Sequence, residues 1–129
     1  MNVTGGCLCG AVRYVATGRQ LNSRVCHCRQ CQKAVGSALN ARILFHGDQV
    51  TFEGIPSTAH SSDDLMRGFC AGCGTSVYTH RLSTNWIGLT VGSLDDPGQF
   101  RPEAHTWVSE KQPWLLICDG LPQFERMPP

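Results

Sequence analysis

The stretch Phe69-Cys-Ala-Gly-Cys-Gly74 holds two cysteines three positions apart in a segment that is rich in glycine. Zinc–sulfur bonds near 2.3 Å place the sulfurs of a tetrahedral site about 3.8 Å apart, a separation that two cysteines on one tight turn can supply. Glycine at Gly72 and Gly74 permits the positive φ angles that turn backbone amides toward thiolates. The stretch therefore has the form of a zinc knuckle.

Two further groups of cysteines have similar spacing. They are Cys7-Leu-Cys9, between Gly6 and Gly10, and Cys26-His-Cys28-Arg-Gln-Cys31, whereas Cys118 stands apart. Eight cysteines in 129 residues are a fraction of about 6%, which lies below the roughly 8 to 10% typical of disulfide scaffolds. The residues before Cys7 lack the basic start and apolar stretch of a secretory signal, so we expect a cytoplasmic location in which thiols stay reduced. Seven of the eight cysteines are therefore predicted to bind metal.

The two pairs and the triplet divide most simply into two zinc sites. Cys7, Cys9, Cys70 and Cys73 would form a closed four-thiolate site that holds distant parts of the chain together. Cys26, Cys28 and Cys31 would hold a second zinc with one open position, which is the pattern of catalytic zinc. A zinc with three thiolates suits the binding of a substrate thiol, so these three cysteines are the predicted catalytic residues.

Other interpretations of the cysteines remain open. The pairs could form disulfides or a redox pair, although Cys70-Ala-Gly-Cys73 lacks the strand-to-helix context of thioredoxin-like motifs. The triplet could be a second structural zinc site completed by Cys118 or His105. Cys118 itself follows the apolar run Leu115-Leu-Ile and is expected to be a buried core thiol. His27 should point away from a metal that both of its neighbours bind.

Length and composition limit the other possibilities. A chain of 129 residues with 41% hydrophobic residues fits one domain, which we expect to span residues 1–129. The net charge is +1 without a basic stripe, so nucleic acid is not an expected partner. No apolar run approaches the roughly 20 residues that cross a bilayer, so we expect no membrane partner either. A small molecule is the expected partner, and nothing indicates an oligomeric state.

The rest of the chain predicts a mainly β fold. Short segments rich in β-branched and aromatic residues alternate with turn residues. The expected strands are residues 10–17, 41–45, 50–53, 65–69, 75–80, 86–91, 103–108 and 114–117. The polar stretch between Val25 and Val35 predicts one or two helical turns that end at Gly36. This would be the only helix near the triplet.

Five motifs in order resemble the glutathione-dependent formaldehyde-activating enzyme family, which also includes centromere protein V. They are Gly5-Gly-Cys-Leu-Cys-Gly-Ala-Val-Arg-Tyr14, Cys26-His-Cys-Arg-Gln-Cys-Gln-Lys33, Phe69-Cys-Ala-Gly-Cys-Gly-Thr75, Val91-Gly-Ser-Leu-Asp-Asp-Pro97 and Pro102-Glu-Ala-His-Thr-Trp107. The resemblance implies a β-tent of small antiparallel sheets, with the structural zinc on the two cysteine pairs and the catalytic zinc on the triplet. It also implies an enzyme that condenses glutathione with formaldehyde, classed as a carbon–sulfur lyase.

Three functions are compatible with these motifs. The leading hypothesis is a zinc enzyme that handles a thiol–aldehyde adduct, with a thiol such as glutathione and an aldehyde as small-molecule substrates. A noncatalytic zinc module for protein contacts is the first alternative, and a thiolate-rich zinc or redox sensor is the second. His105 and Trp107 match a family motif, and we expect them to pack in the core or around the second metal.

Overall fold

The computed structural model describes residues 2–128, and three short strands form the smaller of its two β-sheets. These strands are β1 (Val3–Gly6), β2 (Arg13–Ala16) and β5 (Val50–Glu53). They pair antiparallel in the order β1-β2-β5, with Tyr14 in register with both Gly5 and Phe52. The loop between β1 and β2 carries Cys7 and Cys9.

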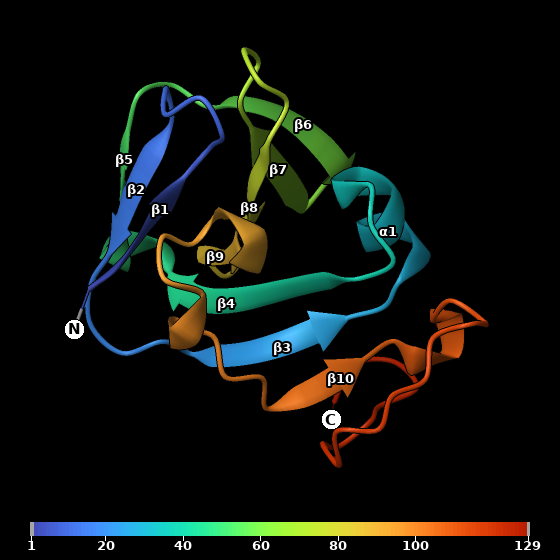
Figure 1. Cartoon of the computed structure of the whole chain (residues 1–129). Coiled ribbons are helices and arrows are strands. Elements are labelled where there is room, and N and C mark those ends of the chain that lie inside the picture. Colours follow the sequence, from blue (N-terminus) through green and yellow to red (C-terminus); the bar gives the residue numbers. More distant parts are fainter. Residues whose placement is uncertain (1, 129) are drawn as a thin grey trace.

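The larger sheet has seven strands in the order β10-β3-β4-β9-β8-β7-β6. Their bounds are β3 Asn22–Cys26, β4 Asn40–His46, β6 Ser57–Ser62, β7 Leu65–Phe69, β8 Ser76–Arg81, β9 Trp86–Thr90 and β10 Ala104–Thr106. All neighbours are antiparallel except β10 and β3, which are parallel. In Figure 1 this sheet curves from β10 at the bottom to β6 at the top, with the small sheet on the left.

The hydrophobic core lies between the two sheets. Alternation along β4 sends Ile43 and Phe45 into this core, where they are 0% and 1% exposed. Tyr14 of β2 and Leu89 of β9 belong to the same cluster. Arg42 and Leu44 of β4 point to the opposite face of the larger sheet, which lines a cavity. The larger sheet thus uses one face for stability and leaves the other for a site.

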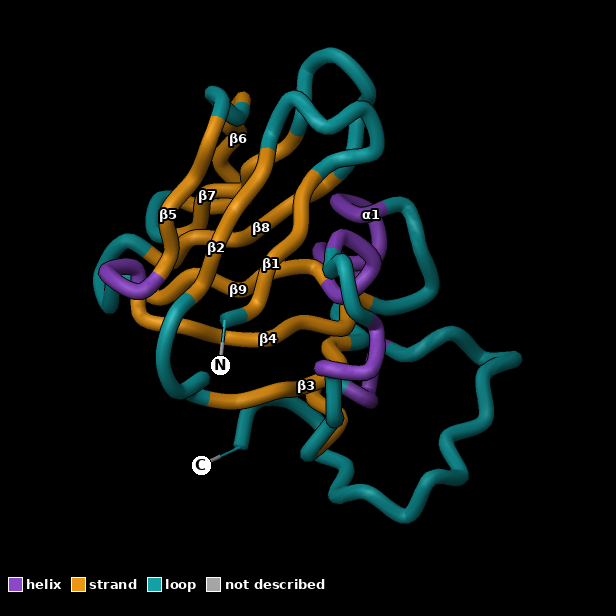
Figure 2. Tube along the Cα trace, turned by 60° about the vertical axis from the view of Figure 1, so that its left-hand side comes forward, coloured by secondary structure: helices purple, strands orange, loops and turns teal. Residues whose placement is uncertain are grey.

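The α-helix α1 (Arg29–Val35) follows directly after β3. Its N-cap is Cys28, whose Sγ accepts a hydrogen bond from the backbone N–H of Cys31. It ends at Gly36, whose φ of 69° is the left-handed conformation that glycine adopts without strain. The predicted helix and its end are therefore confirmed, and both views place α1 beside the ends of β3 and β4 (Figures 1 and 2).

Four 3₁₀ turns connect the remaining segments, and no described helix is long and apolar enough to cross a membrane. The turns are Gly47–Gln49, Val91–Ser93, Pro97–Gln99 and Val108–Glu110. The prediction of a mainly β fold with antiparallel sheets and one short helix is confirmed. Strands β1, β3 and β6 were not predicted, because β1 contains two glycines, the end of β3 overlaps the helix signal, and β6 is polar and exposed.

The prediction of a strand at residues 114–117 is wrong. The edge of β10 is instead paired with the C-terminal segment, since the backbone N–H of Phe124 donates to the carbonyl of His105 and that of His105 donates to the carbonyl of Pro122. The intervening chain forms a loop in which Trp114 and Leu116 are 68% and 83% exposed. Cys118 lies in this loop and is exposed, so its expected burial in the core is also wrong.

Candidate metal centres

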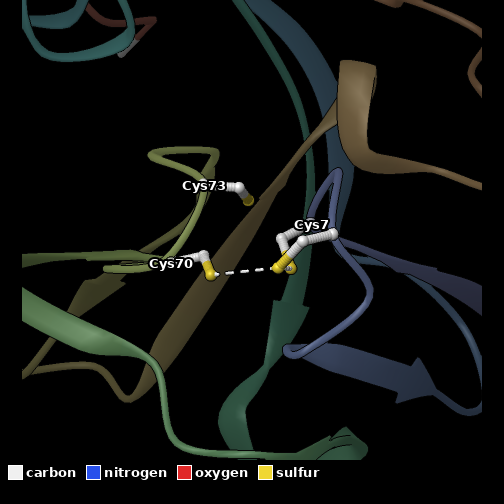
Figure 3. Close-up of side chains that lie close together, drawn as sticks. Cys7, Cys70 and Cys73 are labelled. Atoms are coloured by element: carbon white, nitrogen blue, oxygen red, sulfur yellow. Dashed lines mark hydrogen bonds between the residues drawn. The ribbon is translucent and has the colours of Figure 1, made fainter.

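The first candidate site brings together the cysteines of two loops, one from each sheet. Cys7 and Cys9 lie between β1 and β2, and Cys70 and Cys73 lie between β7 and β8. The four Sγ atoms all lie within 4.8 Å of one another. The Sγ atom of Cys9 is 3.7 Å from those of both Cys7 and Cys70, close to the separation expected around tetrahedral zinc. The donor set and its spacing therefore fit a zinc ion, and Figure 3 shows Cys7, Cys70 and Cys73 directed toward one another.

Hydrogen bonds to two of these four cysteines, Cys7 and Cys73, favour the thiolate form that metal binding needs. The backbone N–H of Val12 lies 3.2 Å from the Sγ of Cys7, and this contact lowers the pKa of Cys7. The Thr75 hydroxyl lies 3.2 Å from the Sγ of Cys73 and lowers the pKa of Cys73 to about 5. The same hydroxyl accepts a hydrogen bond from the backbone N–H of Leu8. Thr75 therefore links the two loops beside their sulfurs.

The second candidate site is formed within one short segment. Cys26 ends β3, Cys28 caps α1 and Cys31 lies in the first turn of that helix. Their Sγ atoms lie within 4.8 Å of one another, with 3.6 Å between Cys26 and Cys31. Among residues 2–128, neither Cys118 nor His105 belongs to a group of metal-ligand atoms at this spacing. The structure thus brings the three predicted cysteines together and leaves the two suggested fourth ligands outside the group.

Arg67 of β7 places a positive charge beside this group. Its side chain is buried, and its Nη2 donates to the Sγ of Cys31 at 3.6 Å while its Nε donates to the Ser61 hydroxyl. Contacts with Cys26 and Cys28, followed by the contact with Arg67, lower the pKa of Cys31. Sequence reasoning missed Arg67, because only the pairing of β6, β7 and β8 brings it within reach of the helix.

Gln32 of α1 holds the three-cysteine segment against the rest of the molecule. It is 3% exposed, and its Nε2 donates to the carbonyls of His27 at 2.6 Å and Glu110 at 2.9 Å. Its Oε1 accepts from Gln112 Nε2 at 2.6 Å. The sequence offered one signal that was not used: an uncharged polar residue on the inner face of a helix usually bonds to buried backbone groups.

The buried side chains of His27 and His105 form a hydrogen-bonded chain that ends at the exposed carboxylate of Asp119. His27 Nε2 lies 2.9 Å from His105 Nδ1, and His105 Nε2 lies 2.7 Å from Asp119 Oδ2. Burial is the main cause that lowers the pKa of His27, and the bond to His105 lowers that of Asp119. His27 is outside the three-cysteine group, consistent with its predicted orientation away from the metal. The expectation that His105 packs near the site is met through this contact with His27.

A cavity of about 530 Å³ opens beside the second group, and both Cys26 and Cys28 are on its wall. None of the four cysteines of the first group lines it. Its wall includes three arginines, Arg24, Arg42 and Arg81, but only one acidic residue, Glu110. Trp107, for which we expected core packing, also lines this cavity and has a positive φ of 56°. The two metal-ligand groups therefore differ in their surroundings.

Comparisons with known proteins concern the fold and the family of the chain. A crystal structure of a Rhodobacter sphaeroides protein superposes with a TM-score of 0.59 at 23% identity, covering 71% of this chain and 87% of that chain. At this identity the likeness concerns the fold alone. No curated protein matches the chain. The family described as glutathione-dependent formaldehyde-activating enzyme matches residues 2–110, a range that includes both cysteine groups. The chain belongs to the family of glutathione-dependent formaldehyde-activating enzymes.

Proposed function

We propose that this chain is a zinc-dependent enzyme of the carbon–sulfur lyase type that forms or cleaves a thiol–aldehyde adduct. The observation that carries the proposal is the contrast between the two cysteine groups, since only the three-cysteine group reaches the cavity wall, through Cys26 and Cys28. Zinc bound by three thiolates would hold an incoming thiol as a thiolate and so keep it nucleophilic. Residues 1–129 would act as one domain with Cys7, Cys9, Cys70 and Cys73 as its structural ligands.

The residues around the three-cysteine group support this function. Arg67 and the backbone N–H of Cys31 donate to thiol sulfurs, which holds Cys28 and Cys31 in place. The cavity beside them can enclose a tripeptide-sized thiol and a small aldehyde, because binding sites for small molecules commonly measure about 300 to 1,000 Å³. In the forward reaction the sulfur forms a bond to the carbonyl carbon, and the thiol proton ends on the former carbonyl oxygen. The reverse reaction breaks the carbon–sulfur bond.

A direct test measures the exchange of glutathione and formaldehyde with S-hydroxymethylglutathione by nuclear magnetic resonance, with the zinc-loaded protein. We expect exchange to be faster than the uncatalysed reaction, and Cys31→Ser to remove the acceleration together with one metal ion. Cys118→Ser is the matched control, because Cys118 is exposed and belongs to neither cysteine group. Equal exchange rates with and without the wild-type protein, for formaldehyde and for larger aldehydes, would contradict the proposal.

The cobalt-substituted protein separates this function from its alternatives. Thiol addition should change the visible absorption bands of the cobalt at the three-cysteine group and leave those of the four-cysteine group unchanged. Absorption bands that do not change on addition of any thiol would favour a noncatalytic zinc module. Release of zinc by peroxide at concentrations that leave no measurable enzymatic turnover would favour a redox sensor.

A further inference from the structure

Two arginines lie side by side on the cavity wall, close to Cys26. Arg24 and Cys26 are two positions apart on β3, so they share a face of the sheet and are separated by about 7 Å of strand. Arg42 of β4 is in direct register with Arg24. Residues directly opposite each other in an antiparallel pair have neighbouring side chains. The strand register thus places two guanidinium-bearing side chains beside the three-cysteine group.

This arginine pair has no acidic partner in the part of the chain that the structure describes. Arg24 makes no side-chain hydrogen bond or ion pair there, and the hydrogen bond of Arg42 is to the amide oxygen of Asn22 at 3.3 Å. Arg81, the third arginine of the wall, does have an acidic partner, because its Nη1 lies 3.3 Å from Asp64 Oδ2. Like charges directly opposite each other destabilise a sheet, so the fold alone gives no reason for the pair.

The electrostatic surroundings of Arg42 also indicate that the arginine pair lacks a negatively charged partner. Burial is the main cause that lowers its pKa, and the charges of Arg24 and Arg81 lower it further. The thiols of Cys26 and Cys31, when ionised, act in the opposite direction. Arg67 already donates a hydrogen bond to Cys31. Arg24 and Arg42 are therefore not the only positive charges that stabilise the thiolates. A negatively charged ligand in the cavity would balance the remaining charge.

The rest of the wall leaves the two guanidinium groups available. Glu110, the acidic residue of the wall, accepts a hydrogen bond from the backbone N–H of Arg29 at 2.7 Å. Gly88 of β9 leaves room for Arg42 to lie along the sheet, because a Cβ at that position would be only 3.0 Å from Arg42 Cδ. Planar guanidinium groups bind carboxylates through two parallel hydrogen bonds. The pair therefore fits an oxyanion, and a carboxylate is the oxyanion that a small thiol substrate such as glutathione carries.

We propose that Arg24 and Arg42 bind a carboxylate of the substrate and make the cavity selective for acidic thiols over neutral ones. This inference rests on the proposed function, since it concerns the thiol that reaches the three-cysteine group. It assigns specificity to two side chains that the cysteine chemistry does not need. A thiol with a carboxylate a few bonds from its sulfur could bind with the sulfur near Cys26 and the carboxylate on the arginine pair.

The test uses S-methylglutathione, whose sulfur carries no ionisable proton, and its diethyl ester, whose carboxylates are neutral. Isothermal titration calorimetry with the zinc-loaded protein should show the acid binding about tenfold more tightly than the ester, which one charge-assisted contact can supply. Arg24→Gln and Arg42→Gln should each remove most of that difference. Arg101→Gln is the matched control, because Arg101 is exposed and absent from the cavity wall. Arg24→Lys should restore part of the preference for the acid.

The outcomes separate this inference from the proposed function. Equal affinity of the wild type for the acid and the ester, no binding of the acid, or an unchanged preference in both glutamine variants would overturn the arginine assignment. Preference for the acid that depends on Arg24 would support it, even if no thiol–aldehyde exchange were observed. If Arg42→Gln fails to fold, the half-buried Arg24 decides the question by itself, with metal content and unfolding temperature as controls for its fold.

Discussion

At the residue scale, Gln32 connects the three-cysteine segment to the rest of the molecule through buried hydrogen bonds. It satisfies two backbone carbonyls, those of His27 and Glu110, at a position that is 3% exposed. Gln32→Leu would keep the approximate size of the side chain and leave both carbonyls without their donor. We expect a loss of about 1 to 3 kcal/mol in the free energy of unfolding, measured by urea denaturation, and weaker zinc binding at the second group.

The matched control for this change is Gln30→Leu on the same helix. Gln30 is exposed, and its Nε2 donates to the carbonyl of Ser61 at the longer distance of 3.3 Å. Its substitution should change the free energy of unfolding by no more than about 0.5 kcal/mol. Similar losses in both variants would mean that the helix responds to any apolar residue and that the buried hydrogen bonds of Gln32 are not the cause.

Tyr14 supplies a prediction about pH. Its hydroxyl lies 2.8 Å from the Ser93 hydroxyl in the core, and burial, as the largest cause, raises the pKa of Tyr14 to about 12. In the unfolded chain the tyrosine hydroxyl would titrate near pH 10. Between pH 10 and 12 the folded state therefore keeps a proton that the unfolded state loses. The contribution of Tyr14 to stability is therefore complete below pH 10 and falls as the pH rises from 10 to 12. Tyrosinate absorbance during an alkaline titration of Tyr78→Phe, in which Tyr14 is the remaining tyrosine, measures the pKa of Tyr14.

The substitution Tyr14→Phe tests the same hydrogen bond at neutral pH. It should lower the free energy of unfolding by about 1 kcal/mol, because it removes one buried hydrogen bond while keeping the ring. Tyr78→Phe is a suitable control, since Tyr78 belongs to the same core cluster but its hydroxyl has no side-chain partner among residues 2–128. An equal loss in the two variants would contradict the importance of the bond to Ser93.

At the scale of elements, the turn between β7 and β8 depends on one glycine conformation. Gly74 follows Cys73 with a φ of 78°, and its backbone N–H donates to the carbonyl of Cys70 at 2.7 Å. Space is not limiting, because a Cβ at Gly74 would meet no heavy atom within 4 Å. Gly74→Ala should therefore cost about 1 to 2 kcal/mol from the left-handed backbone alone. Thermal unfolding of the zinc-loaded protein measures the effect.

Gly92 offers the comparison that isolates the backbone effect. A Cβ there also meets no heavy atom within 4 Å, and the residue does not have a positive φ. Gly92→Ala should be neutral within about 0.5 kcal/mol or slightly stabilising, because alanine restricts the unfolded chain. If both alanine variants unfolded at the same temperature, the conformation of Gly74 would not be the reason for glycine in this turn.

The same scale shows which elements local sequence could predict. Strands β5 and β7 match their predicted ranges, because runs such as Val50–Glu53 combine β-branched and aromatic residues between turn signals. Strand β6 reads Ser-Thr-Ala-His-Ser-Ser and carries no such signal; its pairing with β7 at the edge of the sheet defines it. The apolar run 114–117 carries the signal but no strand, because residues 122–126 occupy the edge beside β10. Pairing over long distances decided both cases.

At the scale of the whole molecule, the candidate site divides into a part that sequence could predict and a part that it could not. The seven cysteines followed from spacing, since each cluster lies within one short segment. The arginine pair depends on the register between β3 and β4, and Arg67 reaches Cys31 across 36 positions of sequence. Neither contact leaves a local pattern. The grouping of the cysteines was therefore predictable, whereas the residues that surround them required the fold.

The two cysteine groups should also differ in what they do for the whole fold. The four-cysteine group joins the loop of the small sheet to a loop of the larger sheet, with Cys9 and Cys70 separated by 61 positions. The three-cysteine group spans only the end of β3 and the start of α1. A metal ion that joins distant segments contributes its binding free energy to folding, whereas one held within a short segment constrains little of the chain. Loss of the first metal should therefore be far more damaging.

Cys70→Ser and Cys31→Ser test this difference directly. Both should lower the zinc content by one ion per chain, measured by mass spectrometry of the native protein. Cys70→Ser should unfold at a much lower temperature or fail to fold, because the junction between the two sheets is lost. Cys31→Ser should keep a circular dichroism spectrum close to that of the wild type, since the hydrogen bond from its backbone N–H to Cys28 does not involve its own side chain. Equal loss of stability in the two variants would show that both metals hold the fold, and the three-cysteine group would then have to be regarded as a second structural site.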